Sequence, residues 1–253
     1  MRIVIADHPV GMGAWVAAQA AAELRAAVDQ RGHARLIVAT GSSQFEVLRG
    51  LVAAKDVPWD RVTGFHLDEY LGLDSNHPAS FCRYLQERFV SKVPLAAFHF
   101  LHGTGMPQQW LAPIVAALQA APIDVALVGI GENGHLAFND PPADFQTEEP
   151  YLIVRLDEAC RAQQVGEGWF ASLDDVPTEA ISMSVRQILK SRRIFCSVPD
   201  RRKSVAVQKS VEGRVDPLVP ASILQTHGNV DLALDRAAAS LLGTASLERA
   251  REV

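Results

Sequence analysis

The chain has 253 residues, of which 48% are hydrophobic and 21% charged, and its formal net charge is −5 at pH 7. These values are typical of a globular protein with one large core, and they argue against a basic nucleic-acid-binding surface. No apolar run approaches the roughly 18 residues of a membrane span, and the first residues lack the features of a secretory signal. The three cysteines, Cys82, Cys160 and Cys196, have no metal-ligand spacing. We therefore expect a cytoplasmic protein without disulfides.

In chain order, short runs rich in β-branched residues alternate with segments of helical periodicity. In the first half we expect strands over 2–6, 34–39, 61–67 and 97–102. We expect helices over 14–30, 44–52, 81–90 and 107–120. The glycines at positions 11 and 13 predict a turn before the first helix.

The most informative stretch is DVALVGIGENGHLAFNDPP, residues 124–142. Its apolar run, 125–130, is typical of a strand that is buried on both faces. The three glycines that follow allow a sharp turn and a close approach to a ligand. His135, Asn139 and Asp140 come next, before two prolines. Because ligand sites in open α/β sheets lie at the carboxyl ends of strands, we predict a catalytic site here.

In the second half we expect strands over 151–156, 193–198 and 230–234, and a strand that runs into a short helix over 180–189. A helix over 202–211, a helical turn over 220–227 and an alanine-rich tail helix complete the chain, whereas 158–170 receives no assignment. No repeat or linker divides the sequence. We expect one domain, residues 1–253, with an α/β fold: a single doubly wound, mostly parallel, Rossmann-like sheet with helices on both faces.

Polar side chains gather at three of the expected strand ends, at 40–43, 68–70 and 133–140. A carboxylate such as Asp68 suits proton abstraction, and a histidine such as His135 suits proton exchange with a hydroxyl. Asp140, five residues further on, would orient the imidazole. Each residue also has a structural interpretation: a hydrogen-bonded core histidine for His135, a cap for Asp68 and an Asx turn for Asp140.

The segment Thr40-Gly-Ser-Ser43 precedes a predicted helix, so it can bind phosphate at a helix N-terminus or simply cap the helix. The stretch 129–134 matches the dinucleotide motif G-x-G-x-x-G, but it lies mid-chain and leaves no room for the helix that this motif needs. The histidines show no metal-ligand spacing. We therefore expect neither a nucleotide cofactor nor a metal.

These motifs resemble the glucosamine-6-phosphate deaminase (isomerase) family, which is related to the 6-phosphogluconolactonases. The similarity extends from residue 36 to about residue 242. The stretches that carry it are Thr40-Gly41, VTGFHLDEYLGLDSNHPASF (62–81), GIGENGHLAFNDPP (129–142) and VEGRVDPLVPASILQTH (211–227). The resemblance implies a cofactor-free aldose–ketose isomerisation of an amino-sugar phosphate, in which glucosamine 6-phosphate gives fructose 6-phosphate and ammonia.

The resemblance also implies roles for individual residues. Asp68 would move a proton from C2 towards C1. Residues that assist ring opening would be Asn133, His135 and Asp140, with His135 exchanging the proton. Residues that bind the substrate phosphate would be Gly41, Ser42, Ser43 and Lys203. The implied partner is a small sugar phosphate, and the sequence leaves open whether the chain forms a homo-oligomer.

The chain departs from the family pattern in several places. The phosphate loop lacks the usual second glycine and threonine, and Asp140 is commonly glutamate in the family. The arginine expected in 165–170 is absent, and Arg161, Arg201 or Arg202 are the candidates to replace it. The stretch 143–154 lacks the basic residues of an allosteric site, which predicts an unregulated enzyme. A 6-phosphogluconolactonase and a non-catalytic sugar-phosphate sensor remain the alternatives.

Overall fold

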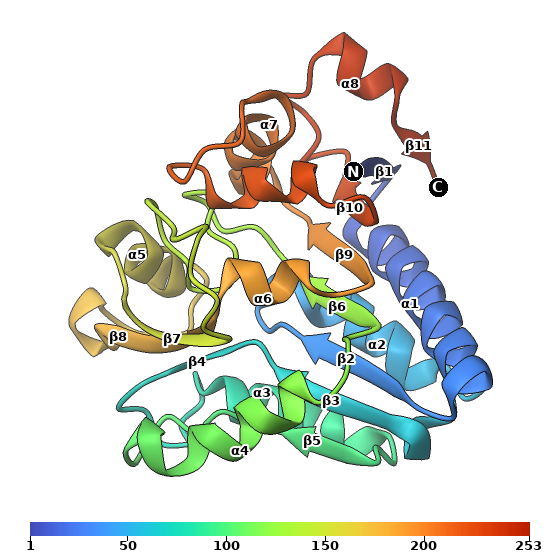
Figure 1. Cartoon of the computed structure of the whole chain (residues 1–253). Helices are drawn as coiled ribbons and strands as arrows, with labels where there is room; N and C mark the ends of the chain where they lie inside the picture. Colours follow the sequence, from blue (N-terminus) through green and yellow to red (C-terminus); the bar gives the residue numbers. More distant parts are fainter.

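The computed structural model describes all residues from Met1 to Val253. Its main feature is an eight-stranded sheet in which every neighbouring pair of strands is parallel (Figure 1). In spatial order the strands are β11 (Arg251–Glu252), β1 (Arg2–Ala6), β10 (Val230–Asp235), β9 (Arg193–Val198), β6 (Val125–Val128), β2 (Ala34–Val38), β3 (Val62–His66) and β5 (Ala97–His99). The predicted α/β fold with a parallel sheet is confirmed.

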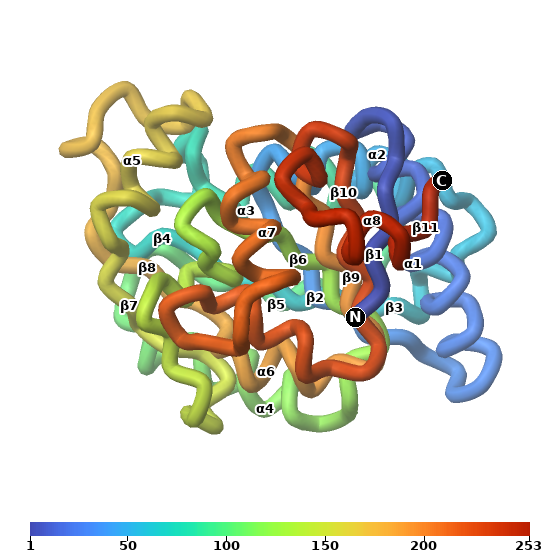
Figure 2. The backbone as a smooth tube through the Cα atoms, turned by 90° about the horizontal axis from the view of Figure 1, so that it is seen from above, coloured from blue at the N-terminus to red at the C-terminus, as the bar shows by residue number.

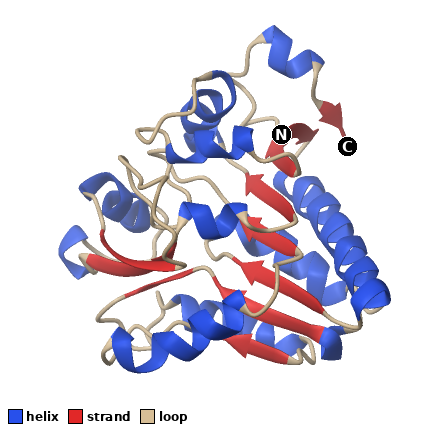
Figure 3. Cartoon of the chain, viewed as in Figure 1, coloured by secondary structure: helices blue, strands red, loops and turns tan.

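Helices cover both faces of this sheet (Figure 3). They are α1 (Pro9–Arg31), α2 (Phe45–Ala53), α3 (Phe81–Arg88), α4 (Pro107–Gln119), α5 (Glu158–Gly166), α6 (Val185–Leu189), α7 (Ser204–Glu212) and α8 (Thr244–Glu248). Short 3-10 turns are Ser42–Gln44, Trp59–Arg61, Val90–Lys92, Leu173–Asp175, Arg201–Lys203 and Pro220–Thr226. No helix combines the length and the apolar character that a membrane crossing requires.

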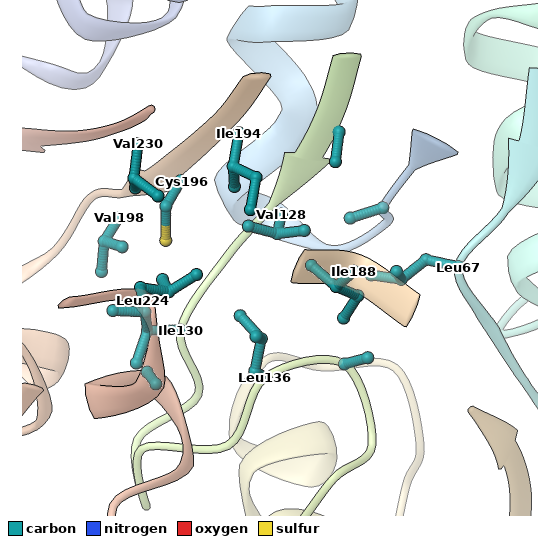
Figure 4. Close-up of a cluster of buried hydrophobic side chains, with 14 of the residues drawn as sticks. Leu67, Val128, Ile130, Leu136, Ile188, Ile194, Cys196, Val198, Leu224 and Val230 are labelled. Atoms are coloured by element: carbon teal, nitrogen blue, oxygen red, sulfur yellow. The ribbon is translucent and has the colours of Figure 1, made fainter. Parts of the chain in front are cut away.

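The core consists of two layers because successive side chains of a strand point to opposite faces. Leu36 and Leu127 pack with residues of α1, α2 and α3 in one layer. Ile37 and Val128 pack with residues of α4, α6 and α7 in the other. Figure 4 shows part of this second layer, in which Leu136 from the loop after β6 joins the side chains of the strands. The loop that carries the predicted site is thus anchored in the core.

A second, antiparallel sheet lies beyond the carboxyl ends of the main strands (Figures 1 and 2). Its strands, in spatial order, are β4 (Asp68–Tyr70), β8 (Glu179–Met183) and β7 (Tyr151–Arg155). It has its own small core, where the ring of Tyr70 lies 4.8 Å from that of Phe81, 5.1 Å from Phe138 and 5.4 Å from Phe170. The sequence predicted a strand over 151–156 and a strand that runs into a short helix over 180–189, as β7, β8 and α6 show, but it did not predict this separate sheet.

The first helix begins at Pro9, five residues before its predicted start, so the turn expected at positions 11 and 13 is wrong. His8 caps the helix, since its Nδ1 accepts a hydrogen bond of 3.0 Å from the amide of Gly11. Gly13 lies inside α1 because α1 and α2 approach closely there: a Cβ atom at this position would lie 2.2 Å from the Cβ of Glu46. The glycine serves helix packing rather than a turn.

The C-terminal part also differs from the prediction. The alanine-rich segment after β10 forms turns instead of a helix, and Ala238 and Ala239 are buried in the core. The amide of Ala238 donates a hydrogen bond of 2.7 Å to Asp235, which holds the chain in this turn. The helix that follows, α8, is short, and it leads to β11 at the edge of the sheet beside β1.

Candidate active site

A polar pocket opens at the carboxyl ends of β2, β3, β6 and β9, under the small sheet and α5. Its wall at the end of β2 is 39–43, and Leu67 and Asp68 follow β3. Residues 129–131 and His135 follow β6, and 198–200 with Arg202 and Lys203 follow β9. From α5 and its end, the pocket receives Gln163, Gln164 and Glu167. The three strand ends singled out in the sequence therefore meet at one site.

Asp68 begins β4, just after the chain leaves β3, and its side chain lines the pocket. The residue is only 6% exposed, and its Oδ1 has no hydrogen-bond partner. Burial, with a further contribution from the neighbouring Glu69 carboxylate, raises the pKa of Asp68 to about 8. A buried carboxylate with a free oxygen and a raised pKa is suited to accept a proton from a bound molecule.

The adjacent acid, Glu69, points to the other side of its strand and has a structural role. Its carboxylate accepts hydrogen bonds from the Ser80 hydroxyl at 2.9 Å and from the amides of Phe81 at 3.1 Å and Cys82 at 2.7 Å. These amides belong to the start of α3, where free N–H groups favour an anion. Of the two neighbouring acids, only Asp68 faces the pocket, as the alternation of strand residues requires.

His135 lines the pocket, and its imidazole is held in position by Asp140. Its Nδ1 lies 3.1 Å from Oδ1 of Asp140, and both side chains are almost buried. Desolvation acts to raise the pKa of Asp140, but hydrogen bonds from His135, the Asp157 amide and Asn133 outweigh this effect and hold the pKa below its usual range. An ionised Asp140 therefore fixes the ring through Nδ1 and leaves Nε2 for the pocket.

Asn133 and Asp140 do not line the pocket themselves. The amide nitrogen of Asn133 donates to Asp140 at 3.0 Å and to Asp157 at 3.1 Å, while its carbonyl oxygen accepts from the backbone of His135 at 3.0 Å. Both residues act on the pocket through His135. Asp157, which caps α5, belongs to the same network but was missed in the sequence because no helix was predicted after it.

Two residues of the central stretch have conformational roles. A Cβ atom on Gly131 would lie 2.2 Å from Nε2 of His135, so the imidazole lies directly against the glycine backbone. Asn139 is buried, and its amide nitrogen donates to the carbonyl groups of Leu136 at 2.7 Å and Met183 at 2.8 Å. It fastens the loop to β8 and does not line the pocket.

The four residues predicted to bind phosphate, Gly41, Ser42, Ser43 and Lys203, all line the pocket. The two serines begin the 3-10 turn that leads directly into α2. The first N–H groups of such a helical segment have no partner within it and can bind an anion. Of the three candidate arginines, only Arg202 lines the pocket. The Arg161 side chain donates instead to the carbonyl groups of Leu173 and Val176.

His135, Asp140 and Cys160 each bring one potential metal ligand within 4.8 Å of the others. Burial, together with the nearby Asp140 and Asp157 carboxylates, raises the pKa of the Cys160 thiol. Asp140 in this trio already accepts hydrogen bonds from Asn133 and from the Asp157 amide, and it lies 3.1 Å from Nδ1 of His135.

The parallel sheet and the pocket at its strand ends define a doubly wound α/β protein in which Asp68 and His135 share a pocket with the serine-containing turn before α2. Residues 9–232 match the model of the family described as Glucosamine-6-phosphate isomerases/6-phosphogluconolactonase, and the chain belongs to this family. It is 35% identical over 214 residues to a glucosamine-6-phosphate deaminase of Oenococcus oeni, covering 84% of this chain and 89% of the relative. The corresponding enzyme of Exiguobacterium sibiricum is 37% identical over 207 residues, covering 81% and 80%.

Solved structures agree with this assignment. A monomeric glucosamine-6-phosphate deaminase superposes with a TM-score of 0.87 and 29% identity, covering 95% of this chain and all of the other. A 6-phosphogluconolactonase from Shewanella baltica has a TM-score of 0.72 at 19% identity, covering 93% and 97%. The second likeness shows a shared fold.

Proposed function

We propose that the chain is a glucosamine-6-phosphate deaminase, which converts glucosamine 6-phosphate and water into fructose 6-phosphate and ammonia. The observation that carries the proposal is the pairing, in one pocket, of a buried Asp68 that has a free oxygen with a His135 oriented by Asp140. Relatives with this name, 35% and 37% identical over most of the chain, support it.

In the proposed mechanism the sugar enters with its phosphate at the start of the 3-10 turn and α2. The backbone N–H groups of Ser42 and Ser43 and the Lys203 ammonium bind the phosphate oxygens. At the other end of the pocket, Nε2 of His135 gives a proton to the ring oxygen and takes one from the C1 hydroxyl. This exchange opens the ring and produces a C1 aldehyde.

Asp68 then removes the proton from C2 and delivers it to C1, while one proton of the amine passes to the C1 oxygen. The C1 aldehyde thereby becomes an alcohol and the C2 amine becomes an imine. Water adds to the imine at C2, ammonia leaves, and the C2 ketone of fructose 6-phosphate remains. Every step is a proton transfer or a hydrolysis, so the side chains of the pocket supply the chemistry that the reaction needs. Asn133 and Asp140 act as positioning residues for His135.

The proposal is tested by measuring ammonia and ketose release from glucosamine 6-phosphate by the wild type, Asp68→Asn and the control Asp60→Asn, whose side chain is exposed. We expect turnover by the wild type and the control, and a loss of at least about 100-fold in Asp68→Asn, as for removal of a general base. If the protein hydrolyses 6-phosphogluconolactone and releases no ammonia from glucosamine 6-phosphate, it is a lactonase. Phosphate-ester binding without any turnover would make it a sensor.

We further propose that the chain works as one domain in the cytoplasm, without an allosteric effector. Its three free cysteines, all buried, are compatible with a reducing compartment. A turnover curve that is hyperbolic in glucosamine 6-phosphate, and that added sugar phosphates do not activate, would support the absence of regulation.

A further inference from the structure

Glu167 places a carboxylate inside the pocket, at the residues proposed to hold the phosphate. Its Oε1 lies 3.5 Å from the ammonium of Lys203, and both side chains are less than a tenth exposed. Its Oε2 accepts a hydrogen bond of 3.3 Å from the hydroxyl of Ser42. Gln163 donates to Oε1 at 2.8 Å and Trp169 donates to Oε2 at 3.3 Å. The carboxylate therefore already engages the Lys203 ammonium proposed to bind the phosphate, and with it the hydroxyl of Ser42 at the start of the phosphate turn.

The positively charged groups at this end of the pocket do not offset the negative charge of the Glu167 carboxylate. Arg202 is paired with Asp200 at 2.9 Å, and its second nitrogen lies 3.6 Å from Glu132. Lys203 is the only other lysine or arginine that lines the pocket. Burial lowers the pKa of Lys203, and the nearby Glu167 and Glu132 only partly offset this effect. A bound phosphate dianion would thus face one buried lysine and a neighbouring acid.

We propose that Glu167 is a specificity-determining residue, whose carboxylate competes with the substrate phosphate for Ser42 and Lys203 and so weakens the binding of phosphorylated sugars. The consequence is a pocket that discriminates less between an amino-sugar phosphate and the free amino sugar. This inference rests on the proposed function, because it assigns the phosphate of the substrate to this end of the pocket. Gln163 and Trp169 keep the carboxylate oriented towards its two partners.

The test is Glu167→Gln, which removes the charge, keeps the size of the side chain and retains one of the two accepting oxygens. Binding of inorganic phosphate is measured by calorimetry, and kcat and KM are measured with glucosamine 6-phosphate and with glucosamine. We expect the Kd for phosphate and the KM for the phosphorylated sugar to fall about tenfold, since a like charge is removed from beside the anion. The KM for glucosamine should fall much less than the KM for glucosamine 6-phosphate, because glucosamine carries no phosphate for the carboxylate to repel.

Glu158→Gln is the matched control, since Glu158 lies exposed at the start of α5, whose other end Glu167 caps. It should leave the affinity for phosphate unchanged. Phosphate binding that is equal or weaker in Glu167→Gln, in a variant with wild-type thermal stability, overturns the inference and would mean that Glu167 positions Lys203. Because calorimetry does not depend on turnover, tighter phosphate binding by a protein that releases no ammonia would support the inference while the proposed deaminase activity fails.

Discussion

Asp68 lies at the point where the chain passes from the large sheet to the small one, which explains its chemical state. Its carboxyl group is surrounded by protein, and it lacks the helix N-terminus that stabilises the neighbouring Glu69. Burial raises the pKa of Asp68 to about 8. We predict that kcat/KM for glucosamine 6-phosphate rises with pH and levels off above a pKa near 8, because only the ionised carboxylate can accept the C2 proton.

The measurement is a profile of kcat/KM from pH 6 to 10, which reports the ionisation of the free enzyme. Asp68→Asn should lose the activity, and Asp60→Asn, exposed at the surface, should keep both the rate and the profile. A profile that is flat over this whole range would contradict the assignment of Asp68 as the base.

The position of the His135 imidazole requires a glycine at residue 131. A Cβ atom there would meet Nε2 at 2.2 Å and Cε1 at 2.3 Å, so Gly131→Ala must displace the imidazole from Asp140. We predict a fall in kcat of about 100-fold, which is typical of a catalytic group moved by about 1 Å. The matched control is Gly166→Ala, because a Cβ atom at Gly166 has no neighbour within 4 Å. Equal kcat values for the two variants would contradict this role of Gly131.

At the scale of elements, the loop from β6 to the two prolines is fixed to the small sheet. Asn139 makes the link, since its buried amide donates to Leu136 in the loop and Met183 at the end of β8. We predict that Asn139→Ala destabilises the protein by about 1–3 kcal/mol, because the buried side-chain hydrogen bonds to Leu136, Ser182 and Met183 are lost. The exposed Asn76→Ala is the control, and thermal unfolding is the measurement. An unchanged Tm in Asn139→Ala would mean that the loop is held by other contacts.

The sequence predicted most elements because buried strands and amphipathic helices leave periodic patterns, and the strand ends placed the predicted pocket residues together. It did not predict α5, because only Cys160 and Gln164 of that helix are buried, and neither is a strong apolar signal. As a result Asp157, Gln163 and Gln164 were missed as parts of the site. The small sheet was missed because β4 has only three residues, two of them acids that are buried for separate reasons.

At the scale of the whole molecule, the two layers of the core make a rigid base, and the small sheet closes over the strand ends. Parallel strands order their carboxyl ends along one edge, so segments far apart in the sequence, after β2, β3, β6 and β9, meet in one pocket. Asp68, at the start of β4 in the small sheet, is left only 6% exposed. The burial that raises the pKa of Asp68 must therefore cost folding free energy when the carboxyl group ionises.

This cost predicts how the stability of the whole protein depends on pH. The pKa of Asp68 is about 8 in the folded state against an ordinary value of 3.8, so the folded state holds the proton more tightly. The stability that Asp68 contributes is complete below pH 4 and is lost as pH rises through 8, by about 1.4 kcal/mol per pH unit in between. Asp68→Asn removes this dependence, so its Tm advantage over the wild type should grow from pH 5 to 8 and then level off.

The measurement is thermal unfolding of the wild type, Asp68→Asn and Asp60→Asn over pH 5 to 9, with each kcal/mol expected to shift Tm by about 2–4 °C. Asp60→Asn makes the same change of charge at an exposed site and should follow the wild type at every pH. If the Tm difference between Asp68→Asn and the wild type stays constant over this range, the folded-state pKa of Asp68 is not raised. Asp68 would then be ionised at neutral pH as an ordinary aspartate is, and burial would not set its pKa. The small sheet that covers Asp68 would then have to act in substrate binding instead.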